Sequence, residues 1–73
     1  GNSNAQFNLA RCYSDGDGVE KNPELALHFY KLAAEQNHLN AQFNLGVRYE
    51  NGIGVEKNPK LALHFYKLSA EQG

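Results

Sequence analysis

Apolar residues recur along the chain at the spacing of a helix, and the same spacing occurs twice. In the first stretch, Ala5, Leu9 and Tyr13 stand four residues apart, which places them on one face of a helix. This pattern predicts a helix near residues 3–14. Its copy predicts another helix near residues 39–50.

A different kind of segment follows each of these helices. Residues 23–36 carry eight apolar side chains, which at ~100° per residue cover well over half the circumference of a helix. Residues 59–72 repeat this pattern. A lone helical hairpin would leave part of such a surface in water, whereas a second hairpin stacked against it would cover that surface.

The chain is a tandem repeat. When it is shifted by 36 residues against itself, 25 of the 37 aligned positions are identical, and the longest shared runs are NAQFNL, GVEKNP and LALHFYKL. We therefore predict an all-α fold, an α/α superhelix (solenoid) of two helix-turn-helix repeats of 36 residues. We place the repeats at residues 1–37 and 38–73 of a single domain.

The turn inside the first repeat has some features of a calcium-binding loop. The segment YSDGDGVEKNPE matches the twelve-residue template at Asp15, Asp17, Gly18 and Glu24. However, Tyr13 stands at the first ligand position, and the second copy, YENGIGVEKNPK, loses the carboxylates at the ligand positions. We therefore interpret the segment as a turn, and a weak calcium site in the first copy only is the alternative.

Both copies keep the residues that shape the backbone of this turn. Two glycines allow positive φ where the first helix ends and the chain reverses. An Asn-Pro pair then predicts the next helix, with asparagine as its N-cap and proline in its first turn. The glycines are Gly16, Gly18, Gly52 and Gly54, and the pairs are Asn22-Pro23 and Asn58-Pro59.

The residues shared by the copies form a family signature. The second copy reads Ala-x3-Leu-Gly-x2-Tyr from Ala41 and then Gly-x-Gly-Val from Gly52. Over essentially the whole chain, this resembles the Sel1-like repeat, a 36-residue relative of the tetratricopeptide repeat (TPR). The resemblance implies a TPR-like adaptor that binds proteins or peptides and has no chemistry of its own. It also implies structural roles for Tyr13, Tyr30, Tyr49 and Tyr66.

Two departures from that signature affect the predicted surface. Ala10 stands where the family has glycine, which predicts looser packing there. Leucines stand where the family commonly has polar residues, and with two histidines they form an apolar ridge along the second helices. If exposed, this ridge is a protein interface; if covered by the next hairpin, it belongs to the core. The ridge consists of Leu25, His28, Leu32, Leu61, His64 and Leu68.

Two hypotheses for function follow. In the first, the chain is a non-catalytic recognition module whose first helices hold a protein or peptide partner with polar side chains. These are Gln6, Asn8, Arg11, Gln42, Asn44 and Arg48. In the second, it is a natural fragment or a designed unit whose only activity is to stack on itself. In either case, the uncovered apolar sides of the outer helices predict a homo-oligomer.

Charge and hydropathy narrow the class of partner. Seven basic and eight acidic residues give a net charge of −1, without a basic cluster for phosphates, so nucleic acid is not expected. No apolar run approaches the ~20 residues of a membrane span, so we expect no membrane partner and a soluble chain. The single cysteine weakly favours the cytoplasm, but the compartment stays open.

Catalysis, metal binding and a cofactor are not predicted. No Ser-His-Asp or Cys-His arrangement has a supporting pocket, so we do not expect an enzyme. His28, His38 and His64 are expected about 10 Å apart in stacked repeats, which is too far to share one zinc ion. Cys12 is either an exposed thiol that could link two chains or a half-buried, inert one.

Overall fold

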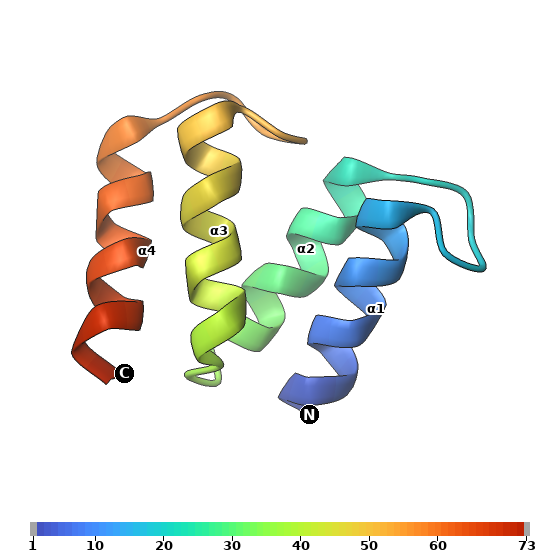
Figure 1. Cartoon of the computed structure of the whole chain (residues 1–73), viewed down its shortest axis with the longest axis horizontal. Helices are drawn as coiled ribbons and strands as arrows, with labels where there is room; N and C mark the ends of the chain where they lie inside the picture. Colours follow the sequence, from blue (N-terminus) through green and yellow to red (C-terminus); the bar gives the residue numbers. More distant parts are fainter. Residues whose placement is uncertain (1, 73) are drawn as a thin grey trace.

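Four helices follow one another in an antiparallel array (Figure 1). The computed structural model describes residues 2–72, and these contain no strand. The helices are α1 (Ser3–Asp15), α2 (Pro23–Ala34), α3 (Leu39–Asn51) and α4 (Pro59–Gln72). Each helix packs against the next along the chain. The all-α, two-repeat architecture expected from the sequence is therefore confirmed.

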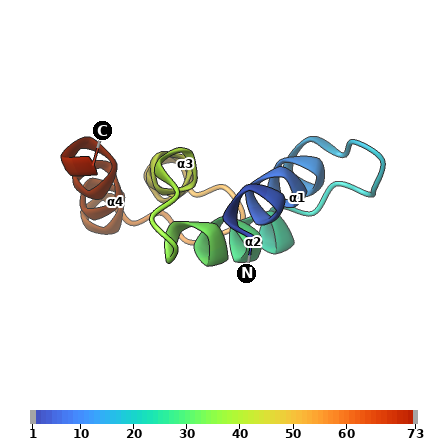
Figure 2. The ribbon, with the colours of Figure 1, turned by 90° about the horizontal axis from the view of Figure 1, so that it is seen from below.

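The array is flat. Its Cα atoms extend over 33 × 26 × 14 Å, so in its thinnest direction the molecule is about two helix layers thick. Viewed from below, α2 lies to one side of α1 and α3 (Figure 2). Within residues 2–72, α2 and α3 each pack extensively against two helices, whereas α1 and α4 each pack extensively against one.

The two turns use the same backbone devices. Asn22 Oδ1 accepts a hydrogen bond from the Leu25 amide at 3.1 Å, and Asn58 Oδ1 accepts one from the Leu61 amide at 3.2 Å. These N-caps satisfy amides that have no partner within the helix. At the other end, Gly16 caps α1 with a left-handed φ of 73°, which a residue with a side chain adopts only at a cost. Positive φ is found at Gly16, Gly18, Gly52 and Gly54.

The predicted helix bounds agree with the structure to within two residues. The largest difference is at α2, which was expected to reach residue 36 and ends at Ala34. Asn37 has a φ of 63°, which no helix accommodates, and the His38 amide donates back to the Ala33 carbonyl at 3.3 Å. The chain thus leaves α2 early in order to turn into α3.

The core runs along the two inner helices. Most of the fully buried apolar residues belong to α2 and α3, whereas α1 contributes only Ala10 and α4 only Ala62. Leu45 is 0 % exposed, while its counterpart Leu9 in the first repeat is 39 % exposed, because α2 covers α3 and no helix of the structure covers α1 in that way. Ala10 is itself fully buried. Whether its side chain loosens the packing relative to the glycine of the second repeat stays a prediction.

Candidate protein-binding surfaces

The junction between the two repeats is where α3 packs on α2. Gln42 is 1 % exposed, and its Nε2 donates to the Ala34 carbonyl at 3.2 Å. The Ala34 carbonyl at the end of α2 also accepts from the Asn37 amide at 3.0 Å, so Gln42 adds a second hydrogen bond to it and is itself satisfied while buried. The side chain therefore holds the two repeats together.

Arg48 bridges three helices at the same junction. The residue is 8 % exposed, its Nη2 donates to Ser14 Oγ of α1 at 2.5 Å, and its guanidinium lies 4.7 Å from the ring centroid of Tyr30 on α2. The ring face attracts the cation and offsets part of the cost of its burial. Within residues 2–72, Arg48 Nε has no hydrogen-bond partner.

Burial corrects one part of the predicted binding face. Gln42 and Arg48 were expected to line an open surface of the first helices, and this is wrong because the preceding hairpin covers them. Arg48 stands seven residues after Ala41, on the apolar stripe that also holds Leu45. Helical register thus turns this polar residue inward despite its charge.

The other four predicted contact residues do not form one surface. Gln6 is half-buried and accepts a hydrogen bond from Gln36 at 2.6 Å. Half-buried Asn44 donates to the Asn40 carbonyl of its own helix at 2.8 Å. Only Asn8 and Arg11, both exposed, lie together, at a small polar pocket of about 220 Å³ on α1.

The same polar pocket holds two of the carboxylates of the calcium alternative. Asp15 and Asp17 line it together with Cys12 and Arg11, whereas Glu24 does not. A fixed positive charge in the pocket opposes the binding of a cation. Cys12 is half-buried there. Within residues 2–72, no group of three or more His, Cys, Asp or Glu side chains is placed to hold a metal ion.

The predicted apolar ridge is only partly exposed. Its two histidines are exposed, and each packs against the phenylalanine that follows it, with ring centroids 5.2 Å apart for His28 and Phe29. All four leucines are half-buried. They are thus neither fully exposed, as an interface would require, nor fully covered, as a place in the core would require. They are Leu25, Leu32, Leu61 and Leu68.

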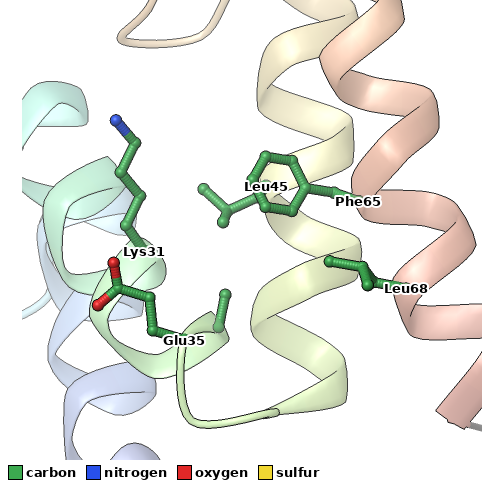
Figure 3. A pocket seen from close by; sticks show the side chains of 6 residues that line it. Lys31, Glu35, Leu45, Phe65 and Leu68 are labelled. Atoms are coloured by element: carbon green, nitrogen blue, oxygen red, sulfur yellow. The ribbon is translucent and has the colours of Figure 1, made fainter.

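One leucine of the ridge lines an apolar pocket between the two second helices. We call this pocket the α2/α4 groove (Figure 3). Leu45 of α3 lies between the two walls, with Lys31 and Glu35 on the α2 side and Phe65 and Leu68 on the α4 side. Its volume is about 230 Å³, and Ala34 completes the lining.

The first helices, by contrast, are bridged by side chains. His38 Nδ1 accepts from the Ala41 amide at 3.2 Å and caps α3, while Nε2 lies 3.0 Å from Asn4 Oδ1 on α1. The imidazole also stacks on Phe7 of α1 at 4.6 Å. Together with the bond between Arg48 and Ser14, these contacts tie α1 to α3. The apolar gap is thus on the α2/α4 side.

The four signature tyrosines pack against aromatic rings in matching ways. Tyr13 stacks on Phe29 at 5.9 Å, and Tyr49 stacks on Phe65 at 5.7 Å. Tyr30 meets Phe7 edge to face at 5.7 Å, whereas Tyr66 Oη donates to Glu50 at 2.8 Å. That hydrogen bond raises the pKa of the Tyr66 phenol, because the phenol can donate it only while protonated; partial burial and the charge of Glu50 act in the same direction.

Two stacked helical hairpins with a shared core define a TPR-like α/α solenoid. The sequence model of the Sel1 repeat matches this chain twice, at residues 3–38 and 39–73. The chain belongs to the Sel1 repeat family. Members of this family are in general non-catalytic repeats that mediate protein interactions.

Solved structures of Sel1 repeat proteins superpose closely on the chain and cover 97 % of it. A Sel1 repeat protein from Oxalobacter formigenes is 48 % identical with a TM-score of 0.95, and the match covers 29 % of that protein. A protective antigen of uropathogenic Escherichia coli with an SLR fold is 37 % identical with a TM-score of 0.95, over 15 % of its length. Helicobacter pylori cysteine rich protein B is 28 % identical with a TM-score of 0.94, over 53 % of its length.

The chain thus spans a minor part or about half of these proteins. A comparison with curated proteins finds no match. Within residues 2–72, no helix has the length and the apolar character that crossing a membrane requires.

Most of the groove residues were missed in the sequence. Leu68 was singled out as part of the ridge, but Lys31, Glu35, Leu45 and Phe65 were not recognised as binding residues. Their counterparts in the other repeat are Lys67, Glu71, Leu9 and Phe29, which are identical in type. A tandem repeat gives no signal for which copy borders a gap, because only the stacking of hairpins creates the gap.

Proposed function

We propose that the chain is a non-catalytic scaffold module that holds a protein or peptide partner by an apolar side chain in the α2/α4 groove. The observation that carries this proposal is the apolar pocket between α2 and α4, in which half-buried Phe65 and Leu68 form the accessible wall and fully buried Leu45 lies behind it. Burial of one leucine-sized side chain there would contribute about 1.5–3 kcal/mol to binding. The groove thus supplies an anchor of the kind that concentrates binding energy.

Charged residues at the groove supply the polar contacts. Lys31 and Glu35 lie one helical turn apart on its α2 side and are both exposed. A partner with an acidic and a basic residue beside its apolar anchor could pair with both. Asn8 and Arg11 on α1, with Asn44 and Gln6, are proposed as further contacts of an extended partner.

Substitution of Leu68 tests the groove. Peptides would be selected on the immobilised chain from a random peptide library displayed on phage, and their affinities measured by calorimetry. We expect Leu68→Gln to weaken them about tenfold or more, because the anchor loses its apolar wall. The helical circular dichroism should persist, since the side chain is half-buried.

The repeat supplies a matched control. Leu32 is the counterpart of Leu68, is equally half-buried, and does not line the groove. Leu32→Gln should therefore leave peptide affinity nearly unchanged. Equal losses in the two variants, or selected peptides that are indifferent to Leu68, would contradict the proposal.

A second candidate function is assembly with copies of the same chain. The exposed apolar residues of the two outer helices favour it, since Leu9 is 39 % exposed on α1 and Leu63 is 55 % exposed on α4. In the inner helices, the counterparts Leu45 and Leu27 are 0 % and 7 % exposed. Light scattering that shows an average mass rising with protein concentration would support self-association.

A further inference from the structure

The outer end of the array carries a pocket beside α4. It has a volume of about 290 Å³ and is formed by side chains of α3 and α4. We call it the end socket. Its lining residues are Glu50, Pro59, Ala62, Leu63 and Tyr66.

The same position one repeat earlier is filled by the second repeat. The counterparts of Glu50, Pro59 and Tyr66 are Ser14, Pro23 and Tyr30. Arg48 donates to Ser14 and covers the ring of Tyr30. Gly54 packs so closely on Pro23 that an added Cβ would lie 2.6 Å from the Pro23 carbonyl oxygen.

The opposite end of the chain carries the surface that would fill the end socket. The face of α3 that packs on α2 includes Ala41, Gln42, Leu45 and Tyr49, and α1 has the identical residues at the same places. These are Ala5, Gln6, Leu9 and Tyr13. This face is only partly covered: Ala5 and Leu9 are exposed, Gln6 and Tyr13 are half-buried, and a Cβ added to Gly18 would meet no heavy atom within 4 Å. The chain therefore carries a second copy of each of the two surfaces that meet in the α2–α3 junction. Within residues 2–72, these second copies do not meet each other.

We infer that a second copy of the chain docks head to tail, with its α1 and first turn in the end socket. This inference rests on the self-association proposed above. It adds how the two copies are aligned on each other and which residues form the contact. The intermolecular contact continues the α2–α3 junction, so Cys12 of one copy lies beside Glu50 and Tyr66 of the next, and Gly18 lies beside Pro59. Since the two faces differ, each added copy leaves a free end, and association is open-ended. In a longer array, neighbouring hairpins would occupy the same two faces.

One difference at this contact makes it weaker than the internal junction. Cys12 stands where the internal junction has Arg48, and Glu50 stands where it has Ser14. The intermolecular contact thus lacks the cation that bridges helices inside the chain. An arginine at position 12 would face the carboxylate of Glu50 and the ring of Tyr66, which already share a hydrogen bond of 2.8 Å.

Sedimentation equilibrium over a range of concentrations in reducing buffer tests the head-to-tail contact. We expect the average mass of the chain to rise with concentration, and Cys12→Arg to shift the rise to about tenfold lower concentration. Leu63→Lys should remain monomeric, because it places a charge in the end socket. Leu63 is 55 % exposed, so the variant should keep its helical circular dichroism.

Two controls make the outcome specific. Ile53→Lys adds the same charge at another exposed apolar residue, outside the end socket, and should associate like the parent chain. Leu68→Gln alters only the α2/α4 groove and should do the same. If the chain self-associates but neither Cys12→Arg nor Leu63→Lys changes this, the proposed head-to-tail contact is wrong and self-association itself is supported. If every variant is monomeric at every concentration, both the head-to-tail contact and self-association are wrong. Neither result bears on peptide binding in the α2/α4 groove.

Discussion

Replacement of Leu45 by alanine is expected to lower the free energy of unfolding by about 2–5 kcal/mol. Leu45 is one of the two largest side chains that are fully buried, and it lies where the two repeats meet. Its loss removes apolar burial and leaves a cavity that the surrounding helices fill only in part. A core of this size supplies roughly 3–5 kcal/mol in total, so the variant should be largely unfolded at 25 °C.

Urea unfolding followed by circular dichroism measures this effect. Sucrose, which favours compact states, would restore a folded baseline if the variant is unfolded in plain buffer. Leu9→Ala is the control, because the residue is identical in type and in repeat position but is 39 % exposed. Leu9→Ala should lower the free energy of unfolding by well under half as much as Leu45→Ala does. Equal costs for the two variants would show that the α2–α3 junction is not the centre of the core.

Alanine at Gly54 is expected to cost about 2–5 kcal/mol, which combines two effects. The left-handed φ of 74° costs a residue with a side chain about 1–2 kcal/mol. The new Cβ would in addition lie 2.6 Å from the backbone oxygen of Pro23, which cannot rotate away as a side chain would. The turn would have to withdraw from α2, and the junction between the repeats would open.

Gly18→Ala separates these two effects. Gly18 has a φ of 79°, but an added Cβ would meet no heavy atom within 4 Å. The free energy of unfolding of this variant should fall only by the cost of the left-handed φ, about 1–2 kcal/mol. Urea unfolding should be measured at low protein concentration, where intermolecular contacts are absent. Indistinguishable losses at the two glycines would refute the close contact between the second turn and α2.

The fold could be derived from the sequence because its determinants are local and occur twice. Asn22 and Pro23 start a helix by capping, and Gly16 ends one by its left-handed φ, so the helix bounds follow from a few residues. The early end of α2 could not be derived in this way. It depends on Asn37, whose positive φ of 63° accompanies the hydrogen bond from the His38 amide back to the Ala33 carbonyl; asparagine tolerates this conformation but does not require it.

The binding surfaces were harder to predict, since burial depends on neighbours. Leu9 and Leu45 are identical in local sequence and differ in exposure only because α2 covers one of them. Gln42 was expected to line an open surface of the first helices that holds a partner. Its burial is made tolerable by the Ala34 carbonyl, a partner that only the tertiary structure provides. Sequence patterns therefore indicate the apolar faces, and the stacking order decides which of them remain open.

The thinness of the array also determines how the molecule exchanges its amide protons. With a shortest extent of 14 Å and one fully buried apolar residue in each outer helix, α1 or α4 can detach while the inner pair stays packed. We expect deuterium to enter α1 and α4 through such partial openings, well before it enters α2 and α3. The chain should therefore open from its two ends, and its slowest-exchanging amide protons should lie in the two inner helices.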